Sequence, residues 1–67
     1  MTDFSNFVND ITSDAFLIAV ENESGKITIP QLDELIYAHP WYEAVDMDTI
    51  EDAVIEIERI LEKEDRI

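Results

Sequence analysis

The sequence predicts a small α+β domain with an amino-terminal helix, a β-hairpin and two carboxy-terminal helices. Apolar residues recur at helical spacing near both ends of the chain, and a β-branched triplet follows a turn-forming segment near the middle. The length of 67 residues is enough for one domain, which we expect to span residues 1–67. An all-α helical bundle is the alternative, because the middle segment also fits a helix followed by a loop.

The first predicted element is a helix from about Asp3 to Ile11. Its apolar residues fall at positions i, i+3, i+4 and i+7, which form one face of a helix. They are Phe4, Phe7, Val8 and Ile11. Thr2 or Asp3 is expected to cap the first turn, because short polar side chains accept hydrogen bonds from the free amides there.

Residues 15–29 fit two structures. Six consecutive apolar residues, 15–20, precede a polar segment with the chemistry of a type I turn, in which Gly25 takes the left-handed position. The triplet 27–29 is β-branched throughout, which suits a strand. These features favour a β-hairpin over its rival, a helix over 13–21 that ends in a loop.

The next element is a helix with a clear start. It begins at a capping box formed by Thr28 and Gln31, with Pro30 in its first turn. It is expected to end before Pro40, because a proline disfavours helical backbone in the residue ahead of it. A turn follows, with one short helical turn through Val45.

The last predicted element is a helix that Asp46 or Asp48 caps and that reaches about Glu64. Its apolar residues repeat at helical spacing and define a buried stripe. They are Ile50, Ala53, Val54, Ile57, Ile60 and Leu61. The spacing of opposite charges also predicts two ion pairs, Glu56–Arg59 and Glu62–Arg66.

Charge is the extreme property of the chain. Seventeen acidic and four basic residues give a net charge of −13. Direct binding to nucleic acid or to an anionic membrane is not expected, because both are polyanions. A basic protein surface, such as that of a nucleic-acid-binding protein, is the expected partner.

The residues expected to contact that partner lie on the last helix and on the aromatic turn before it. Most acidic residues of the helix lie opposite its apolar stripe. Ile55 lies among them, and an apolar residue surrounded by acids resembles an interface centre with a charged rim. Aromatic residues are enriched at binding hot spots and also in small cores. The expected contact residues are Asp48, Glu51, Asp52, Ile55, Glu56, Glu58, Glu62, Trp41 and Tyr42.

No metal, cofactor or catalytic site is expected. The loop from Asn22 to Gln31 resembles an EF-hand calcium loop when Gly25 is set at the sixth position. Val20 and Gln31, however, occupy the first and twelfth positions, where the motif needs Asp and Glu, so an ordinary turn is predicted. His39 is the only histidine and has no partner at a recognisable catalytic spacing, so we expect it to be structural.

The predicted function is that of a non-enzymatic, acidic protein-binding module, an inhibitor or regulator of a basic nucleic-acid-binding protein. In size and composition the chain resembles DNA-mimic inhibitors, many of which are small phage proteins. The alternative is a structural or assembly module that self-associates, as a homodimer, through apolar helix faces. The start of the chain lacks the basic and apolar pattern of a secretory signal, so a cytoplasmic location is expected.

Overall fold

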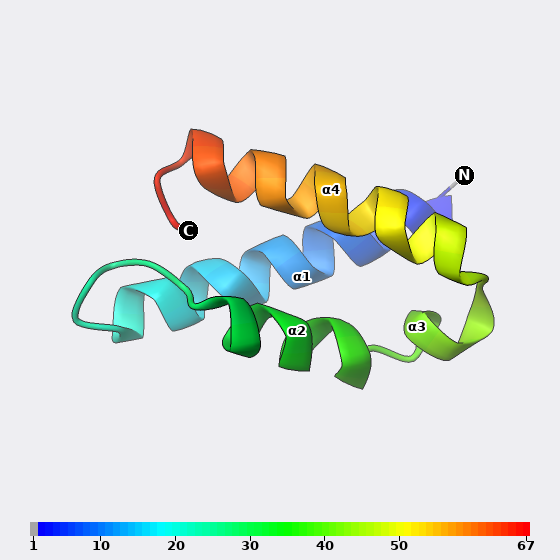
Figure 1. Cartoon of the computed structure of the whole chain (residues 1–67), viewed down its shortest axis with the longest axis horizontal. Helices are drawn as coiled ribbons and strands as arrows, with labels where there is room; N and C mark the ends of the chain where they lie inside the picture. Colours follow the sequence, from blue (N-terminus) through cyan, green and yellow to red (C-terminus); the bar gives the residue numbers. More distant parts are fainter. Residues whose placement is uncertain (1) are drawn as a thin grey trace.

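The computed structural model describes the backbone of residues 2–67 and the side chains from residue 4 onward. Four helices follow one another: α1 (Thr2–Glu21), α2 (Ile29–Ala38), α3 (Trp41–Ala44) and α4 (Met47–Lys63). In Figure 1, α2 runs back along α1, and α4 reverses again at the turn that contains α3. Among the described residues, no helix combines the length and the apolar content needed to cross a membrane.

The predicted β-hairpin is wrong, and so is the α+β class, whereas the all-α alternative fits the structure. Residues 2–67 contain no strand, and α1 continues through Glu21 where the first strand was predicted. The reason lies in Phe7, Ile11, Ala15 and Ala19, which are spaced four residues apart and are all buried. The apolar run therefore extends the stripe of α1, and burial along that stripe outweighs the local preference for a hairpin.

The loop between α1 and α2 ends in the predicted capping box. The Thr28 hydroxyl accepts a hydrogen bond from the Gln31 amide at 3.3 Å, and Gln31 Oε1 accepts one from the Thr28 amide at 3.1 Å. Asn22 Nδ2 donates to Gln31 Oε1 at 2.8 Å, which ties the end of α1 to the start of α2. Gly25 takes the left-handed backbone conformation, with φ +74°, but it does so between two helices. The predicted cap at Thr2 or Asp3 falls on side chains outside the described ones.

Asp46, the residue before α4, is the N-cap of this helix in preference to Asp48. Asp46 Oδ1 accepts hydrogen bonds from the Thr49 hydroxyl at 2.6 Å and from the Thr49 amide at 3.2 Å. These bonds stabilise the carboxylate, so the pKa of Asp46 lies below its ordinary value of 3.8. The predicted ion pair between Glu56 and Arg59 is present on the helix surface.

The chain after α4 folds back onto the α1–α2 loop. Asp65 adopts a left-handed conformation (φ 60°), and the Arg66 amide donates to the Leu61 carbonyl, as in a Schellman motif. The Arg66 carbonyl accepts a hydrogen bond from the Ile27 amide at 2.7 Å, and Arg66 Nη1 donates to the Gly25 carbonyl at 3.2 Å. The predicted Glu62–Arg66 pair is therefore wrong, because the helix ends before Arg66 and the guanidinium turns to the loop.

α1 packs against both α2 and α4, and side chains from these three helices fill the core. The largest fully buried side chains are Phe7, Ile11, Leu32, Ile36, Ile57 and Leu61. In Figure 1, α2 and α4 run in opposite directions on either side of α1. This arrangement brings one side of α2 to face one side of α4.

Candidate functional site

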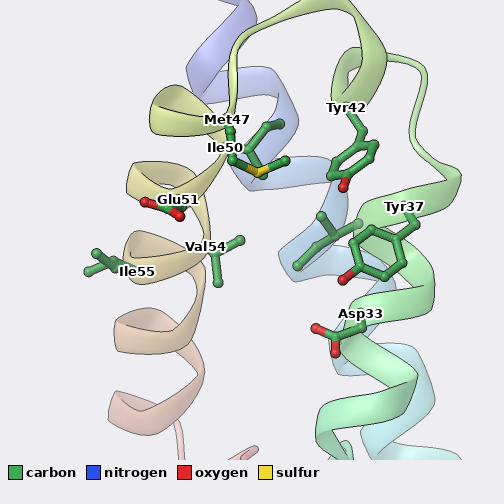
Figure 2. Close-up of a pocket in the computed structure, with 9 residues that line it drawn as sticks. Asp33, Tyr37, Tyr42, Met47, Ile50, Glu51, Val54 and Ile55 are labelled. Atoms are coloured by element: carbon green, nitrogen blue, oxygen red, sulfur yellow. The ribbon is translucent and has the colours of Figure 1, made fainter.

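A groove separates α2 from α4, and we call it the α2–α4 groove. Its volume is about 490 Å³, and it is lined by Asp33, Ile36, Tyr37, Tyr42, Met47, Ile50, Glu51, Val54 and Ile55. In Figure 2, Asp33 and Tyr37 extend from α2 toward α4, and Val54 extends from α4 toward α2. The groove is therefore mostly apolar, and two carboxylates stand on its opposite edges.

The floor and the walls of the groove differ in exposure. Ile36 and Ile50 form the floor and are buried. Tyr37 and Met47, on the walls, are 60% and 54% exposed. The Tyr37 and Tyr42 rings meet edge to face with their centroids 5.0 Å apart, so that α2 and the α3 segment share one wall. The walls thus expose large side chains beside a buried apolar floor.

The residues predicted to contact a partner do not all lie on one side of α4. Five of them follow one another at intervals of three and four residues, which places them along one side of a helix. We call this side the α4 flank: Asp48, Glu51, Ile55, Glu58 and Glu62. Glu51 and Ile55 of the flank also line the groove, so the flank and the groove form one continuous surface.

Ile55 stands at the outer edge of this surface. It is 63% exposed, and in Figure 2 its side chain points away from α2. Asp52 and Glu56 lie on the other side of α4 from the groove, since a residue advances about 100° around a helix. The Glu56 carboxylate is paired with Arg59, so this part of the helix surface is partly neutralised.

None of the four basic residues lines the groove; Lys63 lies in the last turn of α4, and the other three have partners elsewhere. Lys26 pairs with Asp65 at 3.1 Å, Arg59 pairs with Glu56, and Arg66 donates to a loop carbonyl. The lining of the groove includes Asp33 and Glu51 but no basic residue. In this part of the described chain the acidic side chains are therefore not neutralised by the protein itself, and the surface favours cations.

Trp41 and His39 lie next to the groove but belong to the packing between α1 and α3. The Trp41 ring lies 4.7 Å from the Phe7 ring and 6.1 Å from the Phe4 ring, centroid to centroid. His39 Nδ1 accepts a hydrogen bond from the Trp41 amide, so its Nε2 carries the proton and donates to Asp10 Oδ2 at 3.1 Å. Of the two predicted aromatic contacts, only Tyr42 reaches the groove.

The loop that resembles a calcium site makes its own internal hydrogen bonds. Asn22 Nδ2 donates to the Lys26 carbonyl at 2.7 Å as well as to Gln31, and the Ser24 hydroxyl is in contact with Lys26 backbone atoms. Among the described residues, no group of three His, Cys, Asp or Glu side chains is placed to hold a metal ion. The polar side chains of this loop shape the connection between α1 and α2.

Sequence reasoning missed the half of the site that α2 supplies. Asp33 and Tyr37 are four residues apart and so share one side of α2, and Met47 opens α4. An apolar or aromatic residue beside an acid on each of two helices is a weak signal of a shared groove. This signal can be interpreted only when the two helices are known to face each other. A second apolar patch, Leu17 and Val20 on α1, is also exposed and lies outside the groove.

No protein-family model, curated protein or solved structure matches this chain.

Proposed function

We propose that the protein is a non-enzymatic acidic binding module, an inhibitor or regulator that presents its α4 flank to a basic surface of a nucleic-acid-binding protein. One observation carries this proposal. The carboxylates of the flank line up on one side of α4, beside a groove without a basic residue. Arg59 of the same helix is paired with Glu56, outside the flank. The flank thus offers unneutralised negative charge around the exposed Ile55.

The length of the flank suits a surface that otherwise binds nucleic acid. From Asp48 to Glu62 the helix rises about 21 Å, at about 1.5 Å per residue. Duplex DNA carries one phosphate per about 3.4 Å on each strand, so this length matches about six phosphates of one strand. Flexible Lys and Arg side chains tolerate the wider spacing of the four carboxylates. A basic groove evolved for phosphates therefore offers the complementary charge.

The net charge also favours fast capture of such a partner. A charge of −13 on a small protein steers an oppositely charged surface into contact, and salt screens this attraction. Binding is therefore expected to weaken as the salt concentration rises. We also propose a cytoplasmic location for the protein, in the same compartment as its nucleic-acid-binding partner.

Self-association is the second candidate, and the exposed pair Leu17 and Val20 on α1 is the observation that favours it. Two chains would then meet through apolar helix faces, as in an assembly module. Their like charges oppose that contact, because each chain carries −13. A dimer that persists as the salt concentration rises and is lost on Leu17→Glu would support this candidate over the first.

The test compares two triple variants with the same change in net charge. Glu51→Lys, Glu58→Lys and Glu62→Lys reverse charge on the flank, whereas Asp14→Lys, Glu21→Lys and Glu23→Lys do so at exposed positions outside it. Each immobilised protein is used to capture basic proteins from a host lysate at low salt. A captured protein is then purified and titrated in the presence of duplex DNA.

The proposal expects the wild type and the control variant to retain the same basic protein and to displace it from DNA. The flank variant should lose that protein. Equal losses in both variants would mean that net charge alone drives capture, and no loss in the flank variant would place the interface elsewhere. Either result overturns the assignment of the flank.

A further inference from the structure

Helices α1, α2 and α4 leave an uncovered groove in which a further helix would fit. α2 and α4 both pack on α1, and in Figure 2 the α1 ribbon lies behind the groove. On the opposite side, the groove exposes Tyr37 and Met47 over a buried floor. A fourth helix laid between α2 and α4 would cover these side chains and complete a four-helix bundle.

We infer that the α2–α4 groove receives an amphipathic helix of the partner, with an apolar stripe flanked by Lys or Arg. The inference rests on the proposed function, since it names the part of the basic partner that this surface binds. Helix-in-groove recognition places apolar anchors at i, i+3 or i+4 and i+7 into such a groove. The stretch from Met47 to Ile55 on α4 rises about 12 Å, which is about two helical turns and suits two or three anchors.

The acidic residues at the edges of the groove explain why the partner helix should carry Lys or Arg beside its apolar stripe. Asp33 on α2 and Glu51 on α4 stand on opposite edges, so a helix in the groove meets a carboxylate on each side. The Tyr37 and Tyr42 rings add faces that attract Lys and Arg. Lys and Arg also cover apolar surface with their long stems while keeping their charge in water. Glu58 and Glu62 extend the acidic edge beyond the groove.

A second copy of the chain is a poorer occupant. The most strongly amphipathic of the long helices is α4, and its flank carries Glu51, Glu58 and Glu62. In the groove of another molecule these glutamates would face Asp33 and Glu51, and like charges in a shared contact are unfavourable. Charge complementarity therefore selects a basic helix over a copy of this one.

The experiment uses two synthetic peptides with the same leucine and lysine content. In the first peptide the leucines repeat at i, i+3, i+4 and i+7, and in the second they are scrambled so that no apolar stripe forms. Binding to the full chain is measured by calorimetry, and amide chemical shifts locate the contact. The protein variants are Tyr37→Ala with Met47→Ala in the groove, and Leu17→Ala with Val20→Ala as a control of similar exposure.

The expected result is that the amphipathic peptide binds at least about tenfold more tightly than the scrambled one, because apolar anchors dominate such interfaces. The groove variant should lose about tenfold in affinity for the amphipathic peptide, and the control should retain it. Circular dichroism checks that each variant remains helical. Shift changes should concentrate on α2 and on the first half of α4.

Three results overturn the inference. The first is equal affinity for both peptides, which would show a purely electrostatic surface. The second is wild-type affinity in the groove variant. A dimer of this chain that is lost in the groove variant would also overturn it, because the occupant would then be a second copy.

The flank variant separates this inference from the proposed function. If the groove variant loses the amphipathic peptide while the flank variant still captures its protein from lysate, the groove inference stands and the flank assignment falls. If the flank variant loses its captured protein but both peptides bind the wild type equally, the proposed function stands and the groove inference falls.

Discussion

Two sides of α4 differ in what they do for the molecule. The inner stripe, which includes Ile57 and Leu61, faces α1 and is fully buried. The flank, which includes Ile55, faces outward and borders the groove. One helix therefore carries both the centre of the core and the proposed binding surface. The difference predicts that substitutions two residues apart will act on different properties.

The largest effect is expected on the inner stripe. Ile57→Ala removes a completely buried side chain and should lower the free energy of unfolding by about 2–5 kcal/mol. A domain of this size has a margin of only about 3–5 kcal/mol, so most of the variant should be unfolded. Urea denaturation followed by circular dichroism measures the change.

Ile55→Ala is the matched control, because Ile55 is 63% exposed on the same helix. It should change the free energy of unfolding by less than about 0.5 kcal/mol. A loss as large as that of Ile57→Ala would mean that the flank is part of the core, and the contrast between the two sides would fail.

A smaller effect is expected at Gly25, in the loop between α1 and α2 that the residues after α4 contact. Gly25 has φ +74°, and an added Cβ would meet nothing closer than Arg66 Nη1 at 4.0 Å. Gly25→Ala should therefore cost only the backbone strain, about 1–2 kcal/mol. Asn is tolerated in this conformation, so Gly25→Asn should be milder, and thermal unfolding of both variants checks this order.

The start of α4 should make stability depend on pH. Two hydrogen bonds lower the pKa of Asp46 in the folded protein: the one from the Thr49 hydroxyl has the larger effect, and the one from the Thr49 amide has the smaller. A lowered pKa contributes stability that is present above the unfolded value near 3.8 and is lost as pH falls through the folded pKa. Asp46→Asn should therefore reduce the difference in stability between pH 7 and acid, measured against the wild type at matched salt.

The smallest effect is expected on the flank, with the opposite sign. Glu62→Lys places a cation four residues after Glu58 and in the last turns of α4. Both features are favourable, and the variant should be more stable than the wild type by a few tenths of a kcal/mol. Binding to a basic partner should weaken at the same time. Chemical denaturation together with the capture assay would show whether stability and binding separate in this way.

Local signals in the sequence predicted the parts of the fold that depend on neighbouring residues. The stripe of α4 and the capping box of Thr28 and Gln31 are such features, and the structure confirms both. The hairpin prediction failed because the turn before Gly25 and the β-branched residues after it describe local preference only. The burial of Ala19 against other helices decided the outcome.

The acidic half of the candidate site could be predicted from the sequence, and its groove could not. Glu51 and Ile55 stand out on the helical wheel of α4, and the net charge stands out in the composition of the whole chain. Asp33 and Tyr37 join them only because α1 holds α2 at a set distance from α4. No pattern within α2 itself encodes that distance.

Trp41 gives the molecule its own optical reporter. It is the only tryptophan in the chain, and its ring lies against Phe7 in the core. Its neighbour in sequence, Tyr42, lines the groove. Unfolding will expose the indole to water and shift its emission to longer wavelength. A helix that displaces Tyr42 will move α3 and alter the same emission while the protein stays folded. Fluorescence without any attached dye can therefore follow both events, and circular dichroism distinguishes one from the other.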